Sequence, residues 1–243
     1  MPFDLLPFAA PLALLLSAVV AFVAPPRSAG RTARLAEAAA LLSLGIAAIS
    51  AIVLLSHGPV DSRVIGLAGA GFTARIDPVS VTLALLVSFV GWVVVRYAAT
   101  YLDREPRHGA FTGWLCVTLA SVLLLVLSGD LVELVLAWIA TSLGLHRLLL
   151  FYPDRVAAQR AARKKFVTAR AADAALIGAA VLLALAYDTT SITAILTAAR
   201  DGAGGGLAVA AAGLLAIAAL LKSAQFPLHG WLTEVMEAPT PVS

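Results

Sequence analysis

Two residues near the end of the chain, Lys222 and Pro227, interrupt a stretch that is otherwise apolar enough to cross a bilayer. A lysine in hydrocarbon costs about 2.5–3.5 kcal/mol on insertion scales, so we expect Lys222 to face the protein interior or a wet cavity. Proline lacks a backbone donor and clashes with the preceding turn, so the helix should break at about Phe226. Because broken helices within membranes commonly mark ion or substrate sites, the two residues together predict such a site.

A second pair of charges lies in the apolar run from Phe166 to Tyr187. Arg170 and Asp173 are three residues apart, so on a helix they share a face and can form an ion pair. Our hypothesis is that Asp173 is coupled to Lys222 across neighbouring helices, so that a change at one alters the proton affinity of the other. The alternative is a snorkelling Arg–Asp pair at the membrane interface without a role in transport.

Three further titratable residues are candidates for a proton or ion pathway. Glu133 lies near the outer end of the fifth apolar run; the alternative to a pathway role is that it simply sits in the membrane–water interface. His146 lies deeper in that run and titrates near neutrality when unperturbed, which suits a proton relay; its alternative is a hydrogen-bonded packing residue. His229 follows Pro227, where freed backbone groups and water should gather, and is a second relay candidate.

The elements that must position these residues are membrane helices. Hydrophobic residues make up 61% of the 243 residues and charged residues 13%, a balance that a soluble core cannot hide. The apolar segments are rich in alanine and leucine, which favours helices over barrel strands. We therefore expect an all-α polytopic membrane protein with about seven transmembrane helices, the seventh of them broken. The segments are Leu5–Ala24, Leu35–Ser56, Val79–Tyr101, Phe111–Leu127, Leu131–Phe151, Phe166–Tyr187 and a run from about Leu207.

The loops between these segments alternate in charge. The second, fourth and sixth loops are poor in basic residues, whereas the first, third and fifth are rich in them. The positive-inside rule then places the basic loops in the cytoplasm and the N-terminus outside, in the cell inner (plasma) membrane. The basic loop residues are Arg27, Arg31, Arg34, Arg104, Arg107, Arg155, Arg160, Arg163, Lys164 and Lys165.

Two loops have patterns of their own. In the second loop, Gly71–Ile76 alternates and predicts a small extracytoplasmic hairpin. In the fifth loop, Asp154–Lys165 has helical spacing, so it either lies along the headgroups, meets a partner, or serves only to set orientation.

Motifs for bond chemistry are missing from the sequence. The glycine run 204–206 precedes a membrane helix and follows no strand, so it does not fit a phosphate-binding loop. Cys116 is the only cysteine, which excludes a disulfide within the chain. We expect no catalytic residue, cofactor or metal site here and no nucleic-acid partner, and therefore a transport subunit in the lipid bilayer without bond chemistry of its own.

The stretch KSAQFPLHGW from Lys222 to Trp231, with EAPTPVS from Glu237, resembles the proton-translocation signature of antiporter-like membrane subunits. That family includes the large antiporter-like subunits of respiratory complex I and the Mrp cation/proton antiporters (MrpA), and Phe72–Ser80 and Lys165–Asp173 also look like it. The resemblance implies that Lys222 is the broken-helix lysine of a proton half-channel, with Arg170 and Asp173 as the charged pair of helix six. It also implies N-terminal helices and an extracytoplasmic loop in residues 1–70, and a proton-translocating antiporter-like domain in residues 71–243.

The sequence departs from the complex I members at one position. There a glutamate directly follows the helix-five tryptophan, whereas here Trp138 is followed by Ile139, which holds no proton. His146 is seven residues on, nearly on the same helix face, and is our candidate to replace that glutamate. Residues 143–155 and 161–166 look like the DabB subunit of energy-coupled inorganic carbon pumps, which pairs with a large soluble zinc-containing subunit of the DabA type.

We therefore expect an ion-conducting (H⁺ or Na⁺) subunit of an inorganic carbon (CO₂ or bicarbonate) uptake complex. One alternative is an antiporter-like subunit, either of an Mrp antiporter or of NADH:quinone oxidoreductase, in which case it is a proton-pumping part of that enzyme. Another is a scaffold that anchors a soluble enzyme and moves no ion. Because the family continues beyond Ser243 with further helices, the resemblance also predicts the N-terminal, truncated part of an inverted-repeat fold.

Overall fold

The structure is a computed structural model that describes residues 5–25, 28–67, 70–103, 105–152, 155–225, 229–233 and 238–242. In this part of the chain seven helices are long and apolar enough to cross a membrane, which confirms the predicted polytopic helical fold. Two shorter helices, α7 (Ile192–Arg200) and α9 (Gly230–Thr233), accompany them. The seven are α1 (Leu6–Val23), α2 (Ala29–His57), α3 (Pro78–Tyr101), α4 (His108–Leu127), α5 (Leu131–Leu149), α6 (Val156–Tyr187) and α8 (Gly205–Lys222).

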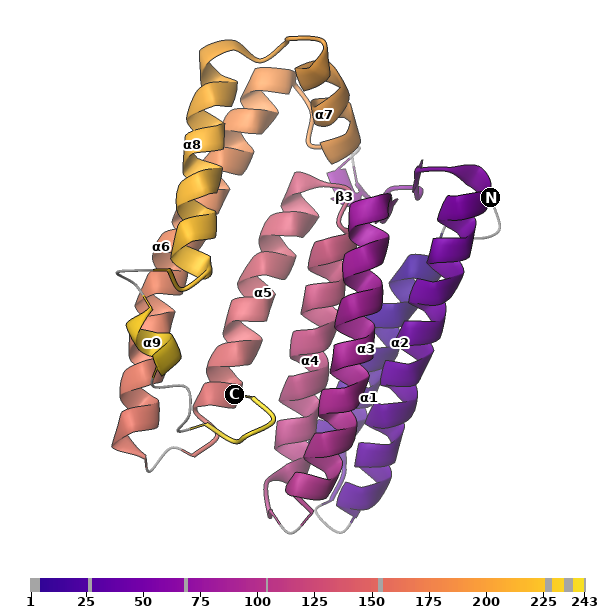
Figure 1. The fold of residues 1–243 in the computed structure, drawn as a ribbon, viewed down its shortest axis with the longest axis vertical. Coiled ribbons are helices and arrows are strands. Elements are labelled where there is room, and N and C mark those ends of the chain that lie inside the picture. The colour runs from indigo at the N-terminus through magenta and orange to yellow at the C-terminus, as the bar shows by residue number, and fades with distance from the viewer. Residues whose placement is uncertain are drawn as a thin grey trace.

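The spanning helices form two groups (Figure 1). In the first group α1 packs on α2 and α4, and α3 packs on α2 and α4. In the second group α6 and α8 run side by side, with buried alanines on both helices, among them Ala172 and Ala211. Small side chains let the backbones of membrane helices approach closely. Because α5 packs on both α4 and α6, it lies where side chains from α6 and α8 can reach it.

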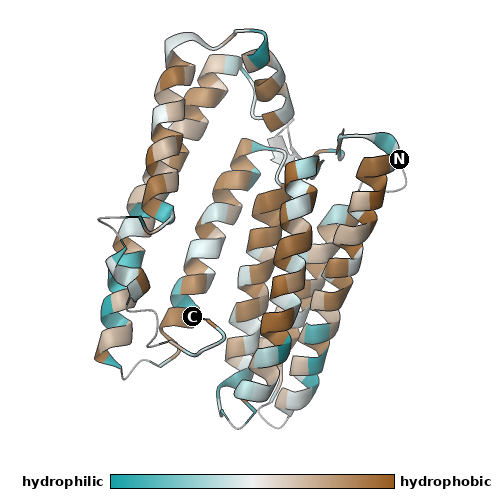
Figure 2. Ribbon diagram, viewed as in Figure 1, coloured by the Kyte–Doolittle hydropathy of each residue, from teal (hydrophilic) through white to brown (hydrophobic). Residues whose placement is uncertain are grey.

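The outer surface of the helices is apolar. Side chains such as Val23, Leu55 and Leu185 are 80%, 87% and 68% exposed, as expected for residues that meet lipid. Figure 2 shows hydrophobic residues along the middle of the spans and hydrophilic residues toward their lower ends. The start of α2, the end of α3, the start of α4, the end of α5 and the start of α6 share that lower end, so the basic residues gather on one side.

The segment between α2 and α3 forms two antiparallel strand pairs. β1 (Val60–Asp61) pairs with β4 (Arg75–Ile76), and β2 (Ile65–Leu67) pairs with β3 (Ala70–Phe72). The predicted strand pairing at Gly71–Ile76 is present but extends beyond this stretch, which contributes to one strand of each of two pairs. Its partners come from the preceding residues, which also need acceptors and donors for their backbone groups.

The stretch that follows β4 is a helix start. Asp77 caps α3: its Oδ1 accepts from the backbone N–H of Ser80 at 2.7 Å, and Ser80 Oγ accepts from the backbone N–H of Asp77 at 2.8 Å. Pro78 occupies the first helical position, where its missing N–H costs nothing. The Asp-Pro-Val-Ser sequence therefore forms a capping box that starts α3 directly after β4.

Two helix ends differ from the prediction, and both differences shape the site. α6 begins at Val156 and not near Phe166, so the basic stretch forms the first turns of a 32-residue helix. At 1.5 Å per residue that helix is about 48 Å long, which exceeds the roughly 30 Å hydrocarbon core of a bilayer. α8 ends at Lys222, about four residues before the expected break, and Ala224 already has a positive φ of 52°. Pro227 itself lies outside the described residues.

Candidate functional site

Lys222 is half-buried at the end of α8, and its side chain reaches α5. Its ammonium Nζ donates to Ser142 Oγ at 2.7 Å and to the carbonyl oxygen of Trp138 at 3.1 Å. It also lies 4.1 Å from the centroid of the Trp138 ring, within the range of a cation–π contact. These contacts all come from α5, although the two residues that the ammonium hydrogen-bonds lie about 80 positions away in the sequence.

A second lysine reaches the same serine from α6. Lys165 Nζ donates to the carbonyl oxygen of Ser142 at 2.6 Å, and the residue is only 5% exposed. Sequence reasoning assigned Lys165 to a basic loop and did not single out Ser142. A signal was present, because Lys165 continues a stripe of small residues at helical spacing that the structure buries. That stripe comprises Ala158, Ala161, Ala162, Ala169 and Ala172.

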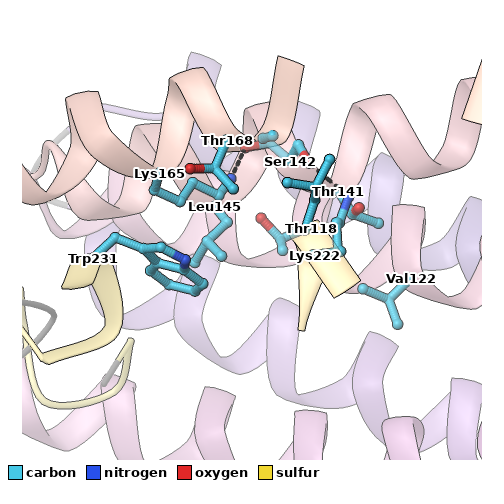
Figure 3. A pocket seen from close by; sticks show the side chains of 11 residues that line it. Thr118, Val122, Thr141, Ser142, Leu145, Lys165, Thr168, Lys222 and Trp231 are labelled. Carbon is cyan, nitrogen blue, oxygen red and sulfur yellow. Dashed lines mark hydrogen bonds between the residues drawn. The ribbon is translucent and has the colours of Figure 1, made fainter. Parts of the chain in front are cut away.

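The two lysines line a cavity of about 150 Å³ (Figure 3). Its walls come from α4, α5, α6, the end of α8 and the short helix α9. Four of the side chains around it carry hydroxyl groups, and none of the described lining residues is acidic. The lining residues are Thr118, Val122, Thr141, Ser142, Leu145, Lys165, Thr168, Ala169, Leu221, Lys222 and Trp231.

Arg170 and Asp173 form the predicted ion pair on α6, with Arg170 Nη2 2.6 Å from Asp173 Oδ2. Asp173 is 4% exposed, so its carboxylate is buried within the protein. Its Oδ1 has no hydrogen-bond partner among the described residues. The Arg170 guanidinium also stacks over the Phe166 ring, 5.1 Å from its centroid.

Lys222 lies within electrostatic range of both Asp173 and Arg170. No ion pair joins the described Lys222 and Asp173 directly, since each has its own partner: Ser142 for the lysine and Arg170 for the aspartate. Any coupling between the two therefore acts through space or through water in the cavity. Lys165 lies within electrostatic range of Lys222, Arg170 and Asp173, so the site brings three cations and one anion near one another.

His146 does not contact Lys222. Its ring lies against Phe166, with 5.0 Å between the centroids, and its Nδ1 has no hydrogen-bond partner among the described residues. It lines a separate recess with Gln159 and Arg163, and it lies within electrostatic range of Lys165. The position that we assigned to His146, beside Lys222, is occupied by Ser142, one helical turn closer to Ile139.

Glu133 lies far from the cavity, at the other end of α5. It precedes Ser142 by nine residues, which is about 13 Å along a helix. The residue is 1% exposed, and its Oε2 accepts from the backbone N–H of Thr73 at 2.9 Å. Glu133 thus joins the strand region to α5 and does not sit in the lipid interface.

This contact leads to a prediction about stability. We expect Glu133→Ala to lower the free energy of unfolding by about 1–3 kcal/mol, because it leaves the part-buried Thr73 N–H without this acceptor. Glu133→Gln retains a carbonyl oxygen at the same place and should unfold close to the wild-type temperature. Thermal unfolding of the purified proteins in detergent measures the difference, and equal melting temperatures for the alanine variant and wild type would show that the contact does not stabilise the fold.

His229, the other relay candidate, is exposed in the structure and does not line the cavity. Its carbonyl oxygen accepts from the Leu232 N–H at 2.9 Å at the start of α9. The described residues contain no group of three His, Cys, Asp or Glu side chains that is placed to hold a metal ion. Of the predicted pathway residues, only Lys222 lines the cavity around Ser142, where it is joined by Lys165.

The fold and the site define a class of polytopic membrane protein. Its features here are a lysine at the end of a spanning helix and, on the neighbouring helix, an ion pair with a buried aspartate. The sequence matches the family described as NADH:quinone oxidoreductase/Mrp antiporter, TM, over residues 128–243. It also matches the N-terminus of chain 5 of NADH-ubiquinone oxidoreductase (complex I) over residues 65–112. The chain belongs to the antiporter-like membrane subunits, as its motifs predicted.

Individual relatives agree with this assignment. The chain is 46% identical over 180 residues to the probable inorganic carbon transporter subunit DabB2 of Halothiobacillus neapolitanus, covering 73% of this chain and 32% of the relative. It is 42% identical over 192 residues to the corresponding DabB of Hydrogenovibrio crunogenus, covering 74% and 35%. In the Mrp complex from Dietzia sp. DQ12-45-1b one chain superposes with a TM-score of 0.79 at 30% identity, over 96% of this chain and 26% of that one. The chain spans about a third of the length of these curated relatives.

Proposed function

We propose that this chain is part of the ion-conducting subunit of an inorganic carbon uptake complex and carries H⁺ or Na⁺ past Lys222. The observation that supports ion conduction is the Lys222 ammonium, a half-buried charge at a helix end that donates to the Trp138 carbonyl oxygen and to Ser142 Oγ. A membrane anchor needs no cation in such a place, because burying it is costly. Residues 71–243 would form the conducting part, and residues 1–70 its N-terminal helices and extracytoplasmic loop.

The geometry supports a route from Lys222 toward the basic end of α6. Ser142 Oγ accepts from the Lys222 ammonium, and a hydroxyl that accepts one hydrogen bond can still donate its own proton to water in the cavity. Lys165 lies on the other side of the same serine, and His146 lies within electrostatic range of Lys165. In this proposal Asp173 supplies the negative charge that Ile139 lacks, and its pairing with Arg170 sets how strongly it acts on Lys222.

The choice of an inorganic carbon complex is supported by the relatives at 42–46% identity, whose names describe inorganic carbon transporter subunits. Relatives of this kind are subunits of larger assemblies, and the partner that we propose is a soluble zinc-containing subunit of the DabA type. Its docking surface would be the basic end of the bundle, which includes the exposed Arg160 and Arg163 at the start of α6. With this end in the cytoplasm, the N-terminus lies outside the inner membrane.

Rescue of a host that lacks carbonic anhydrase tests the function. We expect the full subunit, expressed together with its soluble partner, to restore growth in air, because the pair raises internal bicarbonate. Either protein alone should fail, and added CO₂ should make all strains grow equally. Absence of rescue by a pair that assembles in the membrane would contradict the proposal.

The second candidate is a subunit of an Mrp antiporter or of complex I, which the match to the family and the superposition on the Mrp complex favour. Under that alternative the air-growth assay fails. Instead, expression with the remaining antiporter subunits should restore growth of a sodium-sensitive host at high salt.

A further inference from the structure

The cavity beside Ser142 is lined by two positive charges, one on the buried Lys165 and one on the half-buried Lys222. Lys165 and Lys222 donate to two oxygens of one residue, so their ammonium groups approach each other from α6 and α8. Lys165 also experiences the charge of Lys222. Like charges held together away from water repel each other, and buried charges are normally paired with an opposite charge.

That opposite charge is missing from the described part of the site. Asp173, the acid that acts on both lysines, already has the Arg170 guanidinium 2.6 Å away. On α5, Ile139 lies one helical turn before Ser142 and carries no charge. No described residue that lines the cavity is acidic.

Hydrogen-bond donors remain available around the cavity. An ammonium group has three N–H donors; Lys165 uses one on Ser142, and Lys222 uses two on Ser142 and Trp138. The Ser142 hydroxyl accepts from Lys222 and keeps its own O–H for a further partner. These donors point to one space whose other walls include apolar side chains such as Val122 and Leu145, the composition typical of a small-ligand site.

From these contacts we propose that the cavity between Lys165 and Lys222 binds a small monovalent anion of the size of bicarbonate or chloride. A liquid water occupies about 30 Å³, so the cavity of about 150 Å³ has room for such an anion with some water. The anion adds a negative charge to that of Asp173, which is already paired with Arg170, and it lies against the two lysines and the Ser142 hydroxyl. This inference rests on the proposed function only in placing the site in a transport subunit.

Equilibrium binding to the purified full subunit with its partner tests the proposal. The probes are ¹⁴C-bicarbonate and ³⁶Cl⁻, each measured at constant ionic strength in gluconate, an anion too large for the cavity. We expect saturable binding of at least one probe, and competition between the two shows which anion the site prefers. Lys165→Gln should weaken binding at least about tenfold, the loss expected when a charged hydrogen bond worth 1.5–3 kcal/mol is removed.

Lys164→Gln is the matched control, because Lys164 is the adjacent lysine but is exposed. It changes the net charge equally and should bind like wild type. If Lys165→Gln does not fold, Ile139→Glu is the variant to test. Its carboxylate lies one helical turn from Ser142, so the protein itself supplies the negative charge and the anion should no longer bind. No saturable binding by wild type, or equal loss in the Lys164 and Lys165 variants, overturns the proposal.

The two proposals, the anion site and the carbon uptake function, can be contradicted independently of each other. Lys165-dependent binding without rescue of the carbonic-anhydrase-deficient host supports the site and contradicts the function. Rescue without saturable binding contradicts the site and leaves the function standing.

Discussion

Replacing Lys222 with alanine is expected to reduce ion-coupled carbon uptake to the level of cells without the subunit. The substitution removes the ammonium that contacts Ser142 Oγ, the Trp138 carbonyl oxygen and the Trp138 ring, so no mobile charge remains at the end of α8. Lys222→Arg keeps the charge but should recover little activity. A planar guanidinium cannot take the place of a compact ammonium that contacts both the Ser142 hydroxyl and the Trp138 ring. Uptake of labelled inorganic carbon by cells that express the complex measures the effect.

Arg200→Ala serves as the control for this experiment, since it removes a positive charge from the exposed end of α7, away from the proposed docking surface. It should take up carbon like wild type. The melting temperature of the purified Lys222→Ala protein and its copurification with the partner show whether it has assembled. An assembled Lys222→Ala subunit with wild-type uptake would remove Lys222 from the pathway.

Asp173→Asn is expected to cause the second large effect, on stability and on transport together. Asp173 is buried and paired with Arg170, whose side chain is 35% exposed. Removal of one partner from a fully buried ion pair costs about 3–5 kcal/mol, and water reaching part of Arg170 makes the cost here smaller. Here Lys165 and Lys222 would also lose the one described acid that acts on them. We therefore expect a lower melting temperature in detergent and uptake near background.

A double variant separates the two effects. Arg170→Gln with Asp173→Asn removes both charges, so the unpaired guanidinium is gone and much of the stability should return. Transport should not return, because Lys222 still lacks its acid. If the single Asp173→Asn protein assembles and transports at the wild-type rate, the coupling between Asp173 and Lys222 is wrong and the Arg170–Asp173 pair is a structural ion pair.

The replacement of a glutamate by Ile139 has a clear structural counterpart. A family member with a carboxylate at this place could pair its lysine directly, whereas here Lys222 has only neutral oxygens and an aromatic ring as contacts among the described residues. Neutral partners hold an ammonium more weakly than a carboxylate does, because charge-assisted hydrogen bonds between two ionised groups are the stronger ones. The charge balance of the site is consequently shifted to Asp173 and, in our proposal, to a bound anion.

Much of the architecture could be predicted from local patterns along the chain. Hydropathy and segment length gave the membrane class and the seven spans, because the thickness of the bilayer sets how long an apolar helix must be. The Arg170–Asp173 pair also follows from spacing alone, since residues three apart on one helix are always neighbours. The motif around Lys222 was sufficient to recognise the family.

The composition of the site depended on how the helices pack. Successive residues of a helix are about 100° apart, so a lysine in a basic stretch can face solvent, as Lys164 does, or the core, as Lys165 does. Glu133 meets the backbone of Thr73, sixty residues away, and Lys222 meets Ser142 rather than His146. Periodicity along one helix cannot select the neighbouring residue across an interface, because that choice is made by the rotation and depth at which α6 and α8 pack on α5.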